Sequence, residues 1–367
     1  MKNILYFCKL KNDWNMNQDL RNIFGRRLNQ ARQMKGLSMD ELGNALNPTV
    51  TRQAIYKYEK GQTMPDSRML LAFGDVLCVR PEYFFRPFTV EVDRIMFRKN
   101  AKFAEKKSIA IRERVREELE RYLEAEQLCG TLALFSLQAR DIVSPDDICV
   151  YAKDVRSMLK LGMDGISNVI EVLEENGVKV IEISEDESFE GLSGFANDNI
   201  PVIVVNDNLG TEHKRFILLH ELGHILMKFN DDISYKEAED FCNIFASELL
   251  LPSFVIVSRL GSKRHDISLA ELADIQRQYG ISVDAIMSAL RRLDVITARR
   301  FDGYLKKKRN FPDFRATVER TISRPETTRR FVRMVYRALA DEVITFSKAA
   351  SLLNTSVETV KSQLQLV

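Results

Sequence analysis

The chain has 367 residues, of which 45% are hydrophobic and 29% charged, and its formal net charge is +2. This composition is typical of a globular protein, it excludes a largely disordered chain, and the length suffices for two or three domains. No apolar run is long enough for a membrane span and the opening residues lack the features of a signal peptide, so we expect a soluble, cytoplasmic protein with no membrane partner.

The five cysteines lie far apart in the sequence, and no two of them form a CxxC pair. This spacing favours reduced thiols and argues against a disulfide framework or a thiolate zinc site.

Positive charge is concentrated near the N-terminus. Between residues 18 and 62 there are eight basic residues and four acidic ones, a local net charge of +4. A basic segment of this kind indicates an anionic partner, with nucleic acid the first candidate.

The sequence pattern predicts a mainly α fold with a small β-sheet (α+β). Four regions are expected: a helical DNA-binding domain at 18–87, a helical linker at 88–130, a domain with strands and long helices at 131–260, and a C-terminal helical region at 261–367.

Two short helices joined by a turn are expected within the first region. Ser38 followed by Glu41 forms a capping box that starts the first of them, and Asn47-Pro48 ends it. Thr51 can cap the second, which ends at Gly61. Such a pair can place its second helix in the major groove of DNA, where Arg and Gln distinguish base edges.

This stretch resembles the XRE, or lambda-repressor-like, family of helix-turn-helix domains over about 70 residues, including the "GLS" opening and the "IYKYEKGQTMPD" close. The resemblance implies a double-stranded DNA operator as partner and binding as a homodimer. Met39 departs from the family pattern, which often has Gln there. The residues that the resemblance places at DNA are Ser38, Thr51, Arg52, Gln53, Tyr56 and Lys57.

A long charged segment, Phe97 to Leu128, follows and predicts one amphipathic helix. Its apolar positions Ile111, Val115, Leu119 and Leu123 recur every fourth residue. The repeat is too brief for a coiled coil, so we expect this helix to pack on a neighbouring domain.

The middle of the chain alternates helix and strand patterns. A helix is expected at about 166–176, ending at Gly177, and strands at 178–183, near the letters SGFAN, and at 201–206. The apolar helix "FILLHELGHILMKF" follows, and a second long helix, "YKEAEDFCNIFASELLLP", stops at Pro252.

The HELGH letters are the central motif of the sequence. His220 and His224 lie four residues apart, so one helix face presents both imidazoles to a single ion, while Glu221 projects to the side. This is the arrangement of HExxH zinc hydrolases, with Glu221 as the catalytic base and Zn2+ as the cofactor. The alternative is a pair of core histidines with local hydrogen bonds. Gly223, inside the helix, indicates a close-packed neighbour or an approaching substrate backbone.

A catalytic zinc ion needs a third protein ligand. The second long helix offers Glu239, with Glu237 as the fallback, and Asn243 lies four residues beyond Glu239 on the same face, where its amide can orient a histidine. Tyr235 and His213 are candidates for stabilising an oxyanion.

The two motifs together resemble the ImmA/IrrE family of zinc metallopeptidases over roughly residues 145–255. The resemblance rests on "PVIVVN", "RFILLHELGHIL" and "EDFCNIFASELLLP", with Cys242 where the family usually has Ala. It implies a zincin-like metallopeptidase domain of gluzincin type, with Glu239 as the third ligand. The long charged segment and the C-terminal letters "VITFSKAASLLNTSVETVKSQL" also look like parts of regulators in which the two modules are fused.

The combination predicts a DNA-binding transcriptional regulator whose zinc-dependent peptidase cleaves a partner repressor, or the chain itself, to control gene expression. The alternative is a repressor or antitoxin whose zincin domain senses a ligand or binds a partner such as a toxin without chemistry.

Overall fold

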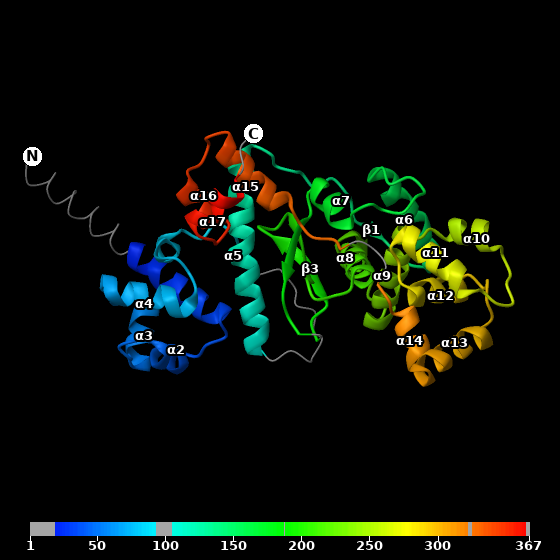
Figure 1. Ribbon diagram of the computed structural model, residues 1–367, viewed down its shortest axis with the longest axis horizontal. Coiled ribbons are helices and arrows are strands. Elements are labelled where there is room, and N and C mark those ends of the chain that lie inside the picture. The colour runs from blue at the N-terminus through cyan, green and yellow to red at the C-terminus, as the bar shows by residue number, and fades with distance from the viewer. Residues whose placement is uncertain (1–18, 93–104, 187, 322–324, 365–367) are drawn as a thin grey trace, which may run out of the picture. The chain divides into compact units, whose positions relative to one another are not determined.

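The computed structural model describes residues 19–92, 105–186, 188–321 and 325–364. Helices dominate and the sheets are small, so the expected mainly α fold with a small β component is confirmed. The chain divides into two compact units (Figure 1): one has described residues 19–92, 105–131 and 331–364, and the other contains 132–330. The long charged helix and the last helices of the chain thus fold with the N-terminal domain.

The first unit is entirely helical over its described residues. Its described helices, in chain order, are residues 19–34, α2 (Met39–Ala45), α3 (Arg52–Glu59), α4 (Ser67–Leu77), the 3-10 helix η1 (Pro81–Phe85), α5 (Glu105–Cys129), α15 (Arg330–Ala340), α16 (Phe346–Leu352) and α17 (Val357–Gln363).

The two short helices α2 and α3 begin where the sequence predicts. The Ser38 hydroxyl accepts from the Glu41 amide at 3.1 Å while the Glu41 carboxylate accepts from the Ser38 amide at 2.6 Å, so the capping box is complete. Thr51 caps α3, accepting from the Ala54 amide at 3.3 Å. Gly61, with φ of +64°, ends the helix in a conformation that favours glycine.

Close backbone contacts fix the position of α3. A Cβ on Gly25 would lie 2.4 Å from the Glu59 carbonyl oxygen, and one on Gly43 would lie 2.3 Å from that of Val50. The buried Arg32 guanidinium is bonded to the Glu59 carboxylate at 2.5 Å, which ties the first helix to the end of α3. Helix α3 is therefore held rigidly while its outer face stays in solvent.

Helix α5 covers the described part of the expected linker helix, and Phe97 to Ala104 lie outside the described residues. Ile111, Val115 and Leu119 are buried and Leu123 is half-buried, which confirms the apolar stripe. A charged face of α5 contacts the helix-turn-helix domain: the buried Arg27 is 2.8 Å from Glu120, and Arg86 is 2.7 Å from Glu117.

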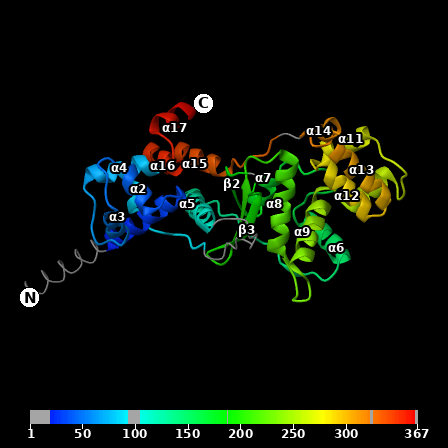
Figure 2. The ribbon, with the colours of Figure 1, turned by 90° about the horizontal axis from the view of Figure 1, so that it is seen from below.

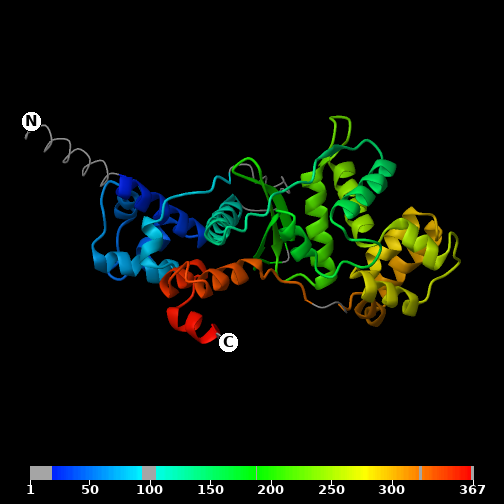
Figure 3. The same ribbon diagram turned by 90° about the horizontal axis from the view of Figure 1, so that it is seen from above.

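The C-terminal helices α15 to α17 pack against the far end of α5. Tyr122 of α5 stacks on Phe331 with ring centroids 5.8 Å apart, and Lys348 of α16 is bonded to Glu124 at 2.5 Å. Figure 3 shows these helices, in orange and red, from above. One compact unit thus joins the helix-turn-helix domain, α5 and the end of the chain.

The second unit combines helices with two small sheets. Its elements in chain order are β1 (Arg140–Asp141), α6 (Pro145–Met158), α7 (Val169–Glu175), β2 (Lys179–Ile183), β3 (Gly191–Ala196), β4 (Ile200–Asn206), α8 (Thr211–Leu226), β5 (Met227–Lys228), α9 (Tyr235–Leu250), α10 (Ser253–Leu260), α11 (Leu269–Tyr279), α12 (Val283–Arg292), α13 (Ala298–Asn310) and α14 (Pro312–Val318).

The main sheet has strand order β2–β4–β3, with β4 parallel to β2 and antiparallel to β3. The three expected strands are confirmed, and β4 is buried along nearly its whole length. The short parallel pair β1 and β5 was not predicted, because two-residue strands leave no periodic signal in a sequence. The helix expected at 166–176 is shorter, since Asn168 caps α7 and delays its start to Val169.

Helix α8 lies on the sheet, and α9 and α6 follow it in succession (Figure 2). Polar anchors hold its first turn: Lys214 is bonded to Glu182 of β2 at 2.7 Å, and the buried Arg215 is paired with Glu326. The core between the sheet, α6, α8 and α9 is continuous with that of α10 to α14. The histidine-bearing helix is therefore central to this unit.

Among the described residues, no single helix is long and apolar enough to cross a membrane. The bent pair α9 and α10 meets both criteria together, and both helices contribute buried side chains to the core of this unit.

Candidate metal centre and helix-turn-helix surface

Helices α8 and α9 bring three potential metal ligands together. Nε2 of His220 lies 3.2 Å from a Glu239 carboxylate oxygen, and Nε2 of His224 lies 3.4 Å from the other. The two Nε2 atoms are 3.0 Å apart. Among the described residues, this is the one group of three or more His, Cys, Asp or Glu side chains whose ligand atoms converge closely enough for one ion.

The spacing of these atoms suits a tetrahedral ion. Zinc bonds of about 2.0–2.1 Å at tetrahedral angles place neighbouring ligand atoms about 3.3 Å apart. The observed separations of 3.0, 3.2 and 3.4 Å bracket that value. The two imidazole nitrogens facing each other repel unless a proton or a cation lies between them. The cluster therefore fits a divalent metal ion.

Residues of α9 contact the Nδ1 atoms of both imidazoles, on the side away from the metal cluster. Nδ1 of His220 lies 2.9 Å from the Asn243 amide oxygen, and Nδ1 of His224 lies 3.0 Å from the sulfur of Cys242. A proton donated from Nδ1 leaves the Nε2 lone pair directed into the cluster, which is the tautomer that a metal ligand needs. The sequence anticipated the Asn243 contact, whereas Cys242 was interpreted only as a small-residue replacement.

Glu221 is buried, with 6% of its surface exposed, and lies beside the cluster on the sheet side of α8. The Ser193 hydroxyl on β3 donates to its carboxylate at 2.6 Å. Strand β3 passes close to α8 here, because a Cβ on Gly191 would lie 2.6 Å from Cγ2 of Ile217. Ser193 was missed in the sequence; the small residues of β3 (GLSGFA) were the available signal of a close approach.

The close packing around Gly223 explains why a glycine interrupts the helix. A Cβ there would lie 3.2 Å from both Cε of Met227 and Cδ1 of Phe245, and 3.4 Å from the sulfur of Cys242. Of the two explanations that the sequence left open, the close-packed neighbour is the one observed.

The other carboxylate and oxyanion candidates lie outside the cluster. Glu237 caps α9, its carboxylate accepting from the Ser234 amide at 3.0 Å. Tyr235 is exposed at the start of the same helix. His213 pairs with Glu190 at 3.3 Å, and the hydrogen bond from His213 holds the pKa of Glu190 below its usual value.

A cleft of about 770 Å³ extends from Asn243 along α8 and α9. Its walls include His213 and Phe216 from α8, Ile244 and Ser247 from α9, and parts of α12 and residues 318–321. This volume is within the range of small-ligand and side-chain sites. The cleft adjoins the metal cluster at Asn243, whereas His220, His224 and Glu239 are not among its lining residues.

The predicted DNA-contacting residues of α3 form an exposed surface. Thr51, Arg52, Gln53, Tyr56 and Lys57 are all exposed, whereas Ile55 on the opposite face is fully buried. Arg52 is 3.7 Å from Asp40, an ion pair that is largely in solvent. Ser38 is half-buried at the start of α2, where it serves as the cap.

Comparison with known families identifies both regions. Residues 28–84 match the family model described as "Helix-turn-helix", and residues 173–291 match the peptidase family model described as "IrrE N-terminal-like domain". An uncharacterised HTH-type transcriptional regulator of Sinorhizobium fredii (strain NBRC 101917 / NGR234) is 41% identical over 61 residues, which are 17% of this chain and 41% of that protein. The chain therefore matches less than half the length of this relative.

Both resemblances expected from the sequence are confirmed: the chain carries an XRE-type helix-turn-helix domain and an IrrE N-terminal-like metallopeptidase domain. The matched peptidase segment includes all of α8 and α9.

Proposed function

We propose that this chain is a DNA-binding transcriptional regulator whose peptidase domain cleaves a protein, either a partner repressor or the chain itself, in a zinc-dependent reaction. The observation that carries the proposal is the convergence of His220, His224 and Glu239, with both outer imidazole nitrogens held by α9. These three residues would hold the ion, and Asn243 orients His220 through the 2.9 Å contact with its Nδ1.

His220, His224 and Glu239 would hold a zinc ion, which would supply Lewis acidity toward a water molecule and the scissile carbonyl. Glu221 accepts the proton of the attacking water and passes it to the leaving amine. Ser193 positions Glu221 through the 2.6 Å hydrogen bond. The burial of Glu221 keeps bulk water away from the proton being transferred.

We assign the alignment of an extended substrate to strand β3. It is an edge strand, paired only with β4 among the described strands, and Ser193 on it is bonded to Glu221. A peptide added to this edge by β-augmentation would run past the metal cluster, with the cleft beside α9 open to its side chains.

DNA binding is assigned to the outer face of α3. Arg52 and Gln53 have side chains suited to base edges, Lys57 supplies a cation for the phosphate backbone, and Thr51, Tyr56 and Ser38 complete the contact surface. Domains of this type bind two-fold sites as pairs, so we propose a homodimer on double-stranded DNA.

Mass spectrometry of the purified full chain tests the peptidase assignment. The chain is incubated alone and with a candidate repressor, in zinc and in a chelator. Product peptides that form only with zinc support the proposal. One zinc ion per chain with no product from any candidate, including the chain itself, would instead indicate a non-catalytic regulator or antitoxin whose zincin domain senses a ligand or binds a partner.

A further inference from the structure

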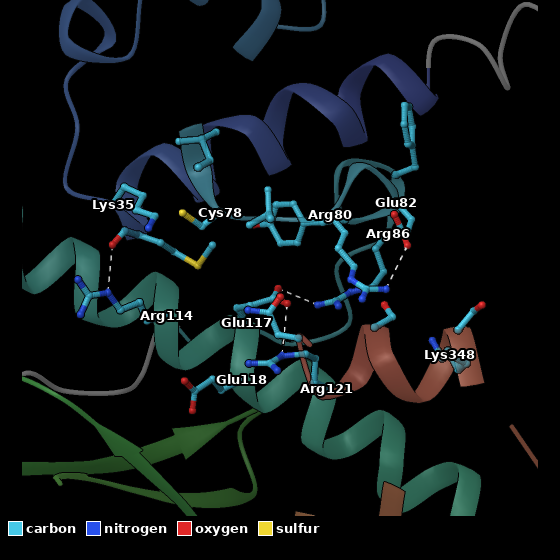
Figure 4. A pocket seen from close by; sticks show the side chains of 18 residues that line it. Lys35, Cys78, Arg80, Glu82, Arg86, Arg114, Glu117, Glu118, Arg121 and Lys348 are labelled. Atoms are coloured by element: carbon cyan, nitrogen blue, oxygen red, sulfur yellow. Dashed lines mark hydrogen bonds and ion pairs between the residues drawn. The ribbon is translucent and has the colours of Figure 1, made fainter. Parts of the chain in front are cut away.

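A second cavity lies in the first unit, remote in sequence from the metal ligands. It encloses about 670 Å³, and Figure 4 shows the side chains that line it. Its walls come from three parts of the unit: the helix-turn-helix domain from Met34 and Lys35 and from Leu77 to Arg86, one face of α5, and α16 with Asn354. A molecule bound there would touch all three.

Positive charge predominates in this cavity. Six cationic side chains line it against three carboxylates, those of Glu82, Glu117 and Glu118. Three of the cations are paired with acids on α5: Arg86 is 2.7 Å and Arg121 3.5 Å from Glu117, and Lys348 is 2.5 Å from Glu124. The six cationic residues are Lys35, Arg80, Arg86, Arg114, Arg121 and Lys348.

Backbone carbonyls also hold three of the guanidinium groups. Arg114 donates to the Met34 carbonyl at 3.0 Å and Arg121 to the Leu352 carbonyl at 2.8 Å, while Arg80 donates to the Thr355 carbonyl. A carbonyl oxygen fixes a guanidinium in place without cancelling its formal charge, and each guanidinium has five donor hydrogens. These side chains are therefore positioned and still cationic.

Two carboxylates reduce this charge only in part. Glu117 lies 3.5 Å from Arg121, and it is shared with Arg86 and, at 3.6 Å, with Arg27. Glu82 is 3.9 Å from Arg80, and 61% of its side chain is exposed to screening solvent. The side-chain ammonium of Lys35 has neither a hydrogen bond nor an ion pair with any residue that the structure describes, and only the Lys35 backbone amide is bonded, to the Ala31 carbonyl at 3.2 Å.

Apolar side chains line the cavity beside the cations. Met34, Leu77, Val79, Tyr83 and Phe85 line the same cavity. A volume of this size is typical of small-molecule sites and far exceeds the space of an inorganic anion. The combination of fixed cations and apolar side chains selects a ligand that has both an anionic group and an apolar or aromatic part.

We propose that this cavity is a binding site for a small organic anion, which bridges the helix-turn-helix domain and the C-terminal helices through α5. The anionic group contacts Arg121, Arg114 and Lys35, and the apolar part lies on Met34, Val79 and Phe85.

Isothermal calorimetry on the full chain at low ionic strength tests this proposal, with 1-naphthyl phosphate as the probe and uncharged 1-naphthol as its matched control. We expect saturable binding of one naphthyl phosphate per chain and binding of 1-naphthol at least about tenfold weaker, because 1-naphthol lacks the charge-assisted hydrogen bonds. Equal binding of the two compounds, or no saturable heat with the phosphate, would overturn the proposal.

Two variants and a control locate the site. Lys35→Met removes an exposed cation that makes no described contact, and Arg121→Gln removes a fixed guanidinium; each is expected to weaken naphthyl phosphate binding about tenfold. Arg68→Met, an exposed residue of α4 that does not line the cavity, should leave it unchanged. Lys35→Met keeps the test decisive if Arg121→Gln fails to fold.

The thiol of Cys78 supplies an independent readout because it is exposed and lines the cavity. Alkylation by N-ethylmaleimide, followed by peptide mass spectrometry, should slow at Cys78 when the probe is bound and stay unchanged at Cys149 in the second unit. Probe binding at the DNA-facing surface or at the metal centre would leave Cys78 alkylation and the Lys35→Met affinity unchanged, and that result would contradict the assignment.

Discussion

Helices α3 and α8 carry their functional side chains in opposite ways. On α3 the proposed DNA-contacting residues are exposed and take little part in packing. On α8, His220 and Glu221 are buried, and each is bonded to a neighbouring element, Asn243 on α9 and Ser193 on β3. A change on α3 should therefore alter function at little cost in stability, whereas a change at the metal centre affects function and local structure together.

The largest expected effect is that of Glu221→Gln. Loss of a general base typically slows a reaction about 10²- to 10⁴-fold. The glutamine keeps the size of the side chain and can still hydrogen-bond Ser193, so zinc content and DNA binding should be retained. Product formation is measured by mass spectrometry beside Glu237→Gln, which removes only a helix-capping carboxylate. Equal product from wild type and Glu221→Gln would show that Glu221 is not the base.

Two glycine substitutions compare how tightly the chain is packed in the helix-turn-helix domain, at Gly43 of α2, and around the metal centre, at Gly223 of α8. In Gly43→Ala the new Cβ would meet a backbone oxygen at 2.3 Å, which cannot move without displacing α2 or the turn before α3. We expect a loss of about 3 kcal/mol in the free energy of unfolding. In Gly223→Ala the nearest atoms, at 3.2 Å, belong to side chains, and alanine gains about 1 kcal/mol of helix propensity.

Gly223→Ala should accordingly change the free energy of unfolding by no more than about 1 kcal/mol. Urea denaturation of both variants, with each unit followed by its own spectroscopic probe, checks the pair. A larger destabilisation from Gly223→Ala than from Gly43→Ala would contradict the contacts described here.

Asn243→Ala tests whether the support behind His220 matters for the metal. Removing such a partner typically lowers metal affinity about 10- to 100-fold, because the imidazole loses its fixed orientation and tautomer. Competition with a chromophoric zinc chelator measures the Kd, and Ser247→Ala, one turn further along α9, is the control. An unchanged Kd in Asn243→Ala would mean that the 2.9 Å contact does not orient the ligand.

Changes on α3 should affect DNA binding and leave the metal centre unchanged. Lys57→Ala should weaken binding to all DNA sequences about equally and lower the slope of log K against log salt by about 1, because one phosphate contact is lost. Gln53→Ala should instead relax the preference at one base position, by about 1–3 kcal/mol. The operator is first selected from random duplexes, and fluorescence anisotropy then follows binding. Identical salt slopes for wild type and Lys57→Ala would remove Lys57 from the interface.

The sequence was sufficient where a local rule determines the structure. Ser38, Thr51 and Gly61 place the ends of α2 and α3, because caps act within a few residues. The i, i+4 spacing of His220 and His224 likewise puts both imidazoles on one face of α8.

The sequence was insufficient where partners come from distant segments. The Ser193 contact with Glu221 depends on how β3 crosses α8, and the cavity of the first unit forms only because α16 returns to α5 after more than 200 residues. Neither of these contacts between distant segments produces a periodic pattern in the amino-acid sequence from which it could be predicted. Glu239 was chosen over Glu237 by its position relative to Asn243. In the structure Glu239 lies with the two histidines, whereas Glu237 completes the capping box of α9.

Zinc-edge X-ray absorption of the purified chain loaded with one equivalent of zinc tests the central claim most directly. The account predicts nitrogen and oxygen ligands at about 2.0–2.1 Å, from two imidazoles and a carboxylate, and no sulfur, because Cys242 lies behind His224 at its Nδ1. A sulfur shell at about 2.3 Å, or a spectrum that is unchanged in His220→Ala, would show that the ion is not held by His220, His224 and Glu239.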